Sequence, residues 1–575
     1  MTTVIAVVGL VVYFVLYLTY GKKLEVDVVK ADNNLQTPAH RLYDGVDYVP
    51  ARTSVLFGHH FASVAGAAPI VGPVLAMAWG WVPALAWVWF GNIFIGAVHD
   101  YLSVMASVRY DGKSIQFVAS DLITKRTGRL FYYLVFFLLI LVVAAFAAVL
   151  GGLFLSNPAI PAATTYLLIG ALIMGVLMYR TKLPFPVVTV IGIAIMITVI
   201  WLGNALPITL SRDAWFLLMF FYIIVAAALP VNVLLQPRDY LNAWLLYFGL
   251  IVGGLAALSA VGTFTAPAFT SFSAVVVGGK PTPFWPVIPL IIACGSLSGF
   301  HSLVGSGTTS KQLTSEKAGL PIGYGVMLVE GFLSTIVVIA VSGFGLAVMT
   351  DAGQTLTAAQ WGTQYTPAME ATFLGAAMFS QTWAAMVAST WLNFIPRDFL
   401  LVIAGMWVSS FAMTTLDTTN RLARYTVAEM ALPLKGKSDG AYRLLSNRWV
   451  ASLIPAAIGI WLGWSGNFTI LWPSFGSANQ LIAAIALLTG TAWVTKRLKA
   501  DSARAFIPAM FLWVTVTAAM IWYAAVPLPA TIAVNPVTGI TVMVIVIIML
   551  LMNFVFIIDF FKTKDQPAAE AEAKG

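Results

Sequence analysis

Long apolar stretches alternate along the chain with short polar connections. Because a helix needs about 20 apolar residues to cross the hydrocarbon core of a bilayer, this pattern predicts a polytopic membrane protein. The candidate spans are 2–20, 56–78, 80–108, 130–155, 163–180, 185–205, 214–235, 241–262, 284–305, 322–349, 368–392, 398–416, 449–464, 467–491, 505–526 and 537–560. We therefore expect an all-α bundle of roughly 15–18 transmembrane helices.

Composition supports this class of protein. Hydrophobic residues make up 60% of the 575 residues and charged residues 9%, whereas a soluble protein carries about 25% charged residues. The net charge of +8 is explained by Lys and Arg in cytoplasmic loops, so no nucleic-acid partner is expected. The single cysteine, Cys294, excludes an intramolecular disulfide framework and Cys-based zinc or iron–sulfur sites. No cleavable signal peptide is evident, and residues 2–20 are interpreted as the first span.

Basic residues in the loops predict the orientation. One short connection holds a cluster of cations and is therefore expected to be cytoplasmic; these are Arg109, Lys113, Lys125, Arg126 and Arg129. Counting spans from this loop places the N-terminus outside and the C-terminus inside. We expect one membrane domain over 1–560 and a polar, disordered cytoplasmic tail over 561–575.

The count conflicts with the charges near residue 400. If 368–392 and 398–416 both crossed the membrane, the basic stretch 421–448 would lie outside. One of the two is therefore expected not to be a full crossing. The stronger candidate is 368–392, because Gln381, Thr382 and Ser389 interrupt it, and a half-helix around 398–416 is the alternative.

The segment from Cys294 to Lys311 is unusually polar for a membrane helix. Helix-breaking sequence at membrane depth is tolerated only where protein or a water-filled cavity covers the freed backbone, and interrupted spans point to transporter binding sites. A close helix contact made by small residues is the alternative, but it does not explain the histidine of this segment. The substrate-binding candidates here are Ser298, Gly299, His301, Ser302 and Gly305. Lys311 is expected to be an anchor or gate residue on the cytoplasmic side.

A second interrupted segment begins at Gly58 and resembles the first. The two align as Gly58/Gly299, His60/His301 and Gly66/Gly307 at a constant offset. Since the two spans are expected to run in opposite directions, the match indicates an inverted repeat with two discontinuous helices facing a central site, with chance similarity as the alternative. The candidates for substrate binding in this segment are Gly58, His60, Ser63 and Gly66.

A third polar insertion lies within the apolar span 467–491. Its Asn479 and Gln480 either form hydrogen bonds across helices or line a substrate pathway, and both are kept as substrate-binding candidates.

Ionisable residues within spans are candidates for ion coupling because they are costly in a membrane. They are His59, His99, Asp100, Glu330 and Asp417. Two have structural alternatives: Asp100 could pair with Arg109, and Asp417 has Arg421 one helical turn away.

Four histidines in or beside spans allow two interpretations. His59, His60, His99 and His301 could form a proton relay or ligate a metal. The sequence has no HExxH, Walker A or GxSxG motif, so we expect neither an enzyme nor a nucleotide-driven pump, and no cofactor. A metal- or haem-binding membrane redox protein that uses the four histidines is the alternative.

Taken together, segments 56–63, 96–100, 236–240, 294–311, 416–418 and 475–481 resemble the carbon starvation protein A (CstA) family. The resemblance implies a secondary transporter of the bacterial inner membrane that imports peptides or pyruvate during carbon starvation. It also implies symport with H⁺, Na⁺ being the alternative coupling ion, a small-molecule substrate and a lipid bilayer as the surroundings. Family members are often longer than this chain. No binding-site assignment is carried over from the family.

Overall fold

The computed structural model describes residues 1–575 except 46, 231–232, 261, 374, 565 and 567–575. Nearly all regular structure in the described residues is helical, as the apolar stretches predict. The helices are α1 (Thr2–Leu16), α2 (Pro38–Arg41), α3 (Thr53–Val64), α4 (Ala68–Ala76), α5 (Trp81–Gly91), α6 (Ala97–Arg109), α7 (Ile115–Leu122), α8 (Lys125–Ser156), α9 (Ala159–Arg180), α10 (Phe185–Ala205), α11 (Arg212–Ala228), α12 (Leu235–Ser259), α13 (Phe284–Ile291), α14 (Gly299–Gly307), α15 (Val326–Asp351), α16 (Ala358–Phe373), α17 (Ala376–Ala388), α18 (Arg397–Met430), α19 (Asp439–Ser446), α20 (Arg448–Ser465), α21 (Phe468–Trp493), α22 (Ala503–Ala525), α23 (Pro527–Val534) and α24 (Pro536–Thr563). Strands β1 (Ser273–Val277) and β2 (Lys280–Pro283) form an antiparallel hairpin.

Eleven helical stretches in the described residues are long and apolar enough to cross a membrane, and the bent pair α3/α4 makes a twelfth. The chain is therefore a helical, multi-pass membrane protein. The sequence pattern predicts roughly 15–18 crossings. The difference falls at expected spans occupied by shorter helices, such as α11 with 17 residues and α17 with 13.

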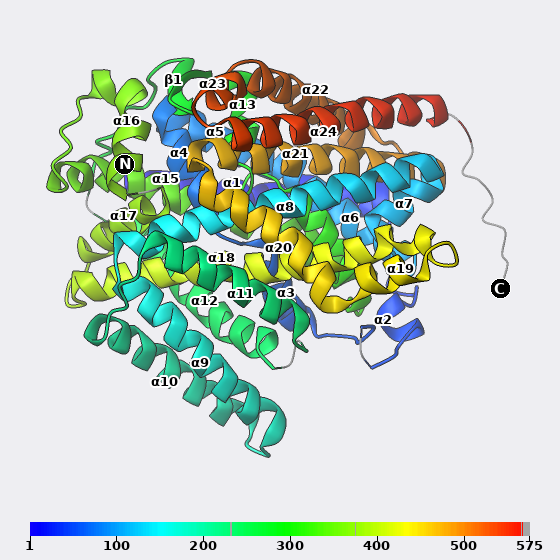
Figure 1. The fold of residues 1–575 in the computed structure, drawn as a ribbon, viewed down its shortest axis with the longest axis horizontal. Helices are drawn as coiled ribbons and strands as arrows, with labels where there is room; N and C mark the ends of the chain where they lie inside the picture. The colour runs from blue at the N-terminus through cyan, green and yellow to red at the C-terminus, as the bar shows by residue number, and fades with distance from the viewer. Residues whose placement is uncertain (46, 231–232, 261, 374, 565, 567–575) are drawn as a thin grey trace.

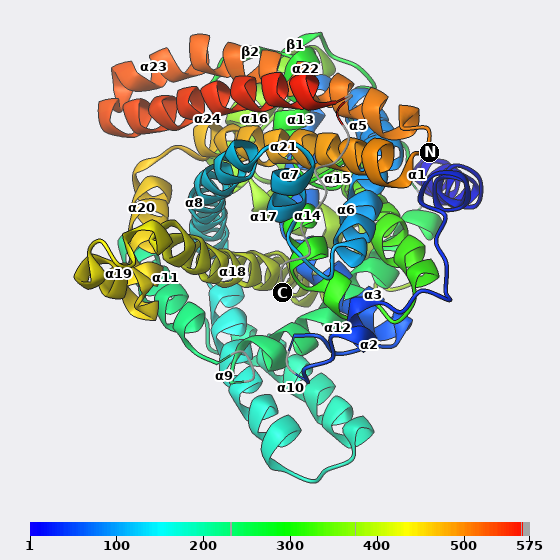
Figure 2. The same ribbon diagram turned by 90° about the vertical axis from the view of Figure 1, so that its right-hand side faces the viewer.

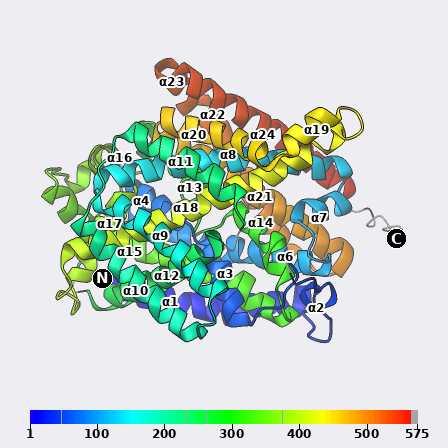
Figure 3. The same cartoon turned by 60° about the horizontal axis from the view of Figure 1, so that its bottom comes forward.

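The two ends of the bundle differ in what they hold. Figures 1 and 3 show α16 at the same end of the bundle as the N-terminus, and α7 and α19 at the other end. Helix α24 ends at Thr563 at the end opposite to Met1. The loop charges predict opposite sides for the two termini, and opposite ends require an odd number of crossings. The twelve stretches counted by length and hydropathy are therefore not the complete set, and shorter or broken helices such as α11 and the pair α13/α14 are candidates for further crossings.

Helices α9 and α10 form a hairpin that projects from one side of the bundle (Figures 1 and 2). The hairpin packs against α12 and α18. Its outer surface is apolar, with Ile169, Val190 and Ile197 exposed. Such a surface suits contact with lipid tails.

The ion pair between Arg397 and Asp351 resolves the conflict near residue 400. Arg397 Nη1 lies 3.8 Å from Asp351 Oδ2, so α18 begins at the end of the bundle where α15 finishes. Helices α16 and α17 therefore leave this end and return to it. The expected crossing at 368–392 is thus not a full one, and α18 crosses to the basic end.

The predicted tail begins too early. Helix α24 continues through Thr563, so residues 561–563 are helical rather than disordered; they extend a helix whose preceding turn is buried against the bundle. Phe560, for example, is 1% exposed. Most of the remaining tail lies outside the described residues.

Candidate functional site

Two spans are broken at the centre of the bundle. Helix α3 ends at Val64 and α4 begins at Ala68, with a bend of 51° between them. The second break separates Ile291, at the end of α13, from Gly299, at the start of α14. Helix α3 packs beside α14, and α4 beside α13, so the two broken spans run antiparallel. The expected pair of facing discontinuous helices is present.

The sequence match between these spans is wrong in register. His60 precedes the break in its span, whereas His301 follows the break in the other. Under the matched offset, residues 65–67 would correspond to 306–308, but the second break lies between Ile291 and Gly299. The match pairs residues on opposite sides of the two breaks because Gly, Ser and His are frequent throughout both segments.

A small cavity lies between the breaks, with a volume of about 20 Å³. It is lined by Ser63, Gly66 and Ala68 from the first break and by Cys294 and Ser298 from the second. We call it the central cavity. Its volume has room for about one water. Ser63, Gly66 and Ser298, all predicted substrate-binding residues, meet here.

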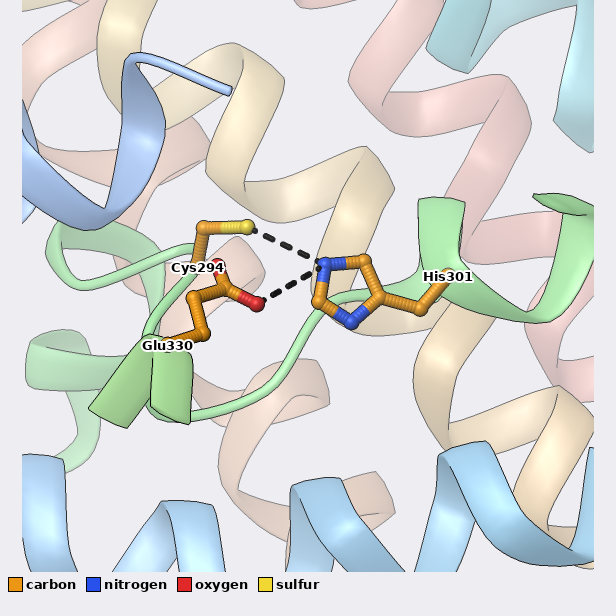
Figure 4. Close-up of side chains that lie close together, drawn as sticks. All are labelled: Cys294, His301 and Glu330. Atoms are coloured by element: carbon orange, nitrogen blue, oxygen red, sulfur yellow. Dashed lines mark hydrogen bonds and ion pairs between the residues drawn. The ribbon is translucent and has the colours of Figure 1, made fainter. Parts of the chain in front are cut away.

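Beside the central cavity, His301 lies between the carboxylates of Asp100 and Glu330. Figure 4 shows its contacts with Glu330 and Cys294. Its Nδ1 is 2.8 Å from Asp100 Oδ2, and its Nε2 is 3.4 Å from both Glu330 Oε2 and Cys294 Sγ. His99 Nδ1 lies 2.7 Å from the other Asp100 oxygen. A protonated imidazole at His301 can donate to both carboxylates, a neutral one to only one. We call these five side chains the acid–histidine cluster; all are buried.

Helix α15 connects the cluster to both breaks. Glu330 Oε1 accepts a hydrogen bond of 3.0 Å from the backbone N–H of Gly295, within the second break. One turn further along α15, Ser334 Oγ donates to the carbonyl of Pro69, just after the first break, at 2.7 Å. Residues four apart lie on the same face of a helix, so one face of α15 holds both breaks.

Helix α21 satisfies the backbone groups that the second break leaves without helical partners. Asn479 Oδ1 accepts from Phe300 N–H at 3.0 Å, and its amide nitrogen donates to the carbonyl of Ala293. Gln480 Nε2 donates to the carbonyl of Leu297 at 3.0 Å. Asn479 and Gln480, expected as substrate ligands or as helix-contact residues, are thus committed mainly to holding the break open.

The other predicted substrate residues lie away from the central cavity. Gly58 packs against the hydroxyl of Tyr247, and Gly305 packs against Val104. His60 Nδ1 lies 2.8 Å from Thr309 Oγ1. Two further predicted residues, Gly299 and Ser302, make contacts of α14 itself. Gly299 lets α14 approach the backbone of α21, and Ser302 Oγ donates to the Gly299 carbonyl at 2.7 Å.

Asp417 belongs to a separate buried network. It forms an ion pair with Arg238 and accepts a hydrogen bond of 2.7 Å from the Tyr222 hydroxyl. The considered partner Arg421 instead donates to the carbonyls of Ala226 and Leu229. For Asp100, the considered partner Arg109 pairs with Glu316 instead.

The four histidines do not converge on one point. His59 is exposed, His60 contacts Thr309, and only His99 and His301 share a partner, Asp100. Among the described residues, the one group of three or more potential ligands lying within 4.8 Å of one another is Cys294, His301 and Glu330. The metal set considered from the sequence is therefore not assembled.

Several residues of the site are missing from the predicted set. Asn92 Nδ2 donates to the carbonyls of Gly295 and Met327, both at 2.7 Å, and Ser334 holds the first break. Both lie within long apolar runs. A single polar residue in such a run is the one signal that could have identified them.

A helical membrane bundle in which two antiparallel broken helices enclose a cavity beside buried ionisable groups has the architecture of secondary transporters. The chain belongs to the family described as carbon starvation protein CstA, whose sequence profile matches residues 1–519.

Curated relatives cover most of the chain. The Bacillus subtilis protein named peptide transporter CstA is 31% identical, over 96% of this chain and 95% of its own length. The Escherichia coli pyruvate/proton symporter BtsT is 30% identical, over 90% of this chain and 79% of its own. Among solved structures, an Eremococcus coleocola manganese transporter aligns with 90% of this chain and 97% of its own at 12% identity and a TM-score of 0.42, too low to show a common fold.

Proposed function

We propose that the protein imports a small organic nutrient, a peptide or pyruvate, across the bacterial inner membrane by symport with protons. The N-terminus then lies in the periplasm and the C-terminus in the cytoplasm, as the basic loops predict. The observation that carries the proposal is the position of His301, between Asp100 and Glu330 and one side chain away from the central cavity. The names of the relatives, which include peptide transporters and a pyruvate/proton symporter, support the substrate classes.

The central cavity is the proposed substrate site. Helix α4 begins at Ala68 and α14 follows Ser298, and both residues line the cavity. Helix N-termini carry partial positive charge and favour anions. The carboxylate of pyruvate or of a peptide C-terminus suits this position.

The substrate needs more room than the central cavity offers. Phe146 and Phe475 close one wall of the cavity, and both rings contact Trp472, with centroids 6.2 Å and 5.3 Å from it. Trp472 is fixed by a hydrogen bond of 2.8 Å from Nε1 to the carbonyl of Ile291 at the second break. A movement of that break therefore displaces the aromatic wall and enlarges the cavity.

Proton coupling follows from the bond between Glu330 and Gly295. An ionised Glu330 carboxylate holds the N–H of Gly295 more strongly than a protonated one, because charged acceptors form stronger hydrogen bonds. Proton transfer within the acid–histidine cluster thus changes the energy of the second break. A ligand that alters the break must in turn alter proton affinity, since coupling is reciprocal.

The test is uptake by the purified protein in liposomes with a proton gradient, a sodium gradient or no gradient, using labelled pyruvate and labelled dialanine. We expect accumulation of one substrate with an inward proton gradient alone. Accumulation driven only by sodium would contradict proton coupling, and no accumulation of either substrate under any gradient would contradict the proposed function.

A further inference from the structure

A second, larger cavity lies at the end of the bundle that holds Met1. Its volume is about 610 Å³, and it is walled by the β1–β2 hairpin, α16, the α20–α21 connection, α23 and the start of α24. These elements gather at one end in Figure 1. We call it the hairpin cavity. Its size is in the range of small-molecule sites, roughly 300–1,000 Å³.

Two polar groups of α16 line the hairpin cavity with no hydrogen-bond partner among the described residues. Thr366 is 3% exposed, and its Oγ1 is one of them. The other is Glu370 Oε1, one turn later, which is also buried. Buried polar groups in proteins nearly always have hydrogen-bond partners. A ligand that donates hydrogen bonds to these two oxygens would therefore bind with unusually favourable free energy.

The other polar side chains of the wall are already used. Asn467 Oδ1 accepts from the backbone N–H of Thr469 at 2.9 Å, and Asn535 Nδ2 donates to the carbonyl of Ser465 at 2.9 Å. Unpaired acceptor capacity is therefore concentrated on Thr366 and Glu370.

The charges of the wall are one acid and one base. Glu370 comes from α16 and Lys280 from the hairpin, and the remaining lining residues carry no charge. Lys280 forms no ion pair within the part of the chain that the structure describes. Burial raises the pKa of the Glu370 carboxyl to about 7, so this carboxylate gains from a cation placed beside it.

Helix α21 leads from the hairpin cavity to the central cavity. Thr469 and Ile470 line the first and Phe475 the second. Five residues of helix span about 7.5 Å, and Trp472 lies between them. A ligand in the hairpin cavity is thus separated from the central site by one layer of aromatic side chains.

We propose that the hairpin cavity binds a small zwitterion before transport, with Glu370 and Thr366 receiving its ammonium group and Lys280 its carboxylate. This rests on the proposed function and narrows its substrate class to compounds with both charges, such as short peptides. Pyruvate lacks the ammonium group and is not a ligand of this cavity.

The test uses equilibrium binding of labelled dialanine to the full-length protein in lipid nanodiscs at pH 7.5. Charged hydrogen bonds contribute about 1.5–3 kcal/mol, so we expect Glu370→Gln to weaken dialanine binding about tenfold or more. Lys280→Met is expected to weaken it less, because Lys280 is more exposed. Asp398→Asn removes an exposed acid at the same end of the bundle and is expected to leave the affinity unchanged.

Unchanged dialanine affinity in Glu370→Gln, or equal competition by N-acetyl-dialanine and dialanine against the wild-type protein, would overturn the site. Uptake is measured on the same preparations. Glu370-dependent binding without gradient-driven uptake would refute the proposed function and leave the binding site standing. Gradient-driven uptake together with dialanine binding that is unchanged in Glu370→Gln would refute the hairpin-cavity site but not the proposed function.

Discussion

His301 Nδ1 lies 2.8 Å from Asp100 Oδ2, although 201 positions separate the two residues in the chain. The contact joins α6 to the half-helix that follows the second break. Both side chains are buried, in a medium where charged groups are costly. Removing one partner leaves Asp100 with His99 alone, or His301 with Glu330 alone.

Asp100→Asn should therefore uncouple transport. We expect the accumulation ratio under a proton gradient to fall to about one, while exchange of internal for external substrate continues, because the central cavity is intact. Uptake and counterflow in liposomes measure the two, with Asp398→Asn as the control for loss of one acidic charge. Full uphill uptake with unchanged pH dependence would remove Asp100 from the coupling role.

Glu330→Gln tests the same coupling from the other carboxylate. The amide keeps an oxygen for the N–H of Gly295 but cannot release a proton. We expect counterflow to persist and pH-driven accumulation to be lost. If Glu330→Gln accumulates substrate as the wild type does, proton exchange at the second break is not the coupling step.

Asn479→Ala should destabilise the protein, since it leaves the Phe300 N–H and the Ala293 carbonyl buried without partners. Each such group costs about 1–3 kcal/mol, so we expect a clearly lower thermal unfolding midpoint in detergent. Asn479→Asp keeps an acceptor oxygen for the Phe300 N–H, so its unfolding midpoint should differ from that of Asn479→Ala. An unchanged midpoint in Asn479→Ala would mean that α21 does not hold the break.

Arg238 and Asp417 should behave as a structural pair. Removing one partner of a buried ion pair costs about 3–5 kcal/mol, so Arg238→Gln and Asp417→Asn should each lower the unfolding midpoint strongly. The double variant should recover much of this loss, because no buried charge is then left unpaired; Asp239, the second partner of Arg238 at 2.8 Å, is 36% exposed. The pH dependence of residual uptake in the double variant should match the wild type; a shifted profile would return Asp417 to the coupling groups.

The affinity for dialanine should depend on pH through Glu370. Its carboxyl has a pKa of about 7 and attracts an ammonium group only when ionised, so affinity should rise about twentyfold between pH 5.5 and 7.5. Above pH 8 affinity should fall, because the peptide amino group itself loses its proton. Glu370→Gln should abolish the rise and keep the fall; a rise that persists in this variant would assign it to another group.

Much of the fold could be predicted from the sequence because hydropathy reports directly on burial in a bilayer. The two broken spans were identifiable for the same reason, since Gly and Ser interrupt runs that are otherwise apolar. The partner of His301 was not identifiable, because nothing in the local sequence links Asp100 to a residue so distant along the chain. The roles of Asn479 and Gln480 were undecided for a related reason: an amide that serves a backbone and one that serves a ligand look alike in sequence.

The predicted register of the inverted repeat is wrong because the two segments resemble each other in composition rather than in position relative to the break. His60 and His301 stand in similar Gly- and Ser-rich surroundings, yet they lie on opposite sides of their breaks. The relation between the two spans is carried by the position of each break, which depends on backbone contacts with α15 and α21. Sequence similarity over three residues does not record those contacts.

The hold of α15 on both breaks depends on an interval of four residues between Glu330 and Ser334. Each residue of an α-helix turns the chain by about 100°. One residue inserted between these two would carry Ser334 away from Pro69 while Glu330 stayed on Gly295. The spacing between Glu330 and Ser334 is thus important for function in its own right. An insertion that adds no charge and removes no side chain should let the two breaks move independently.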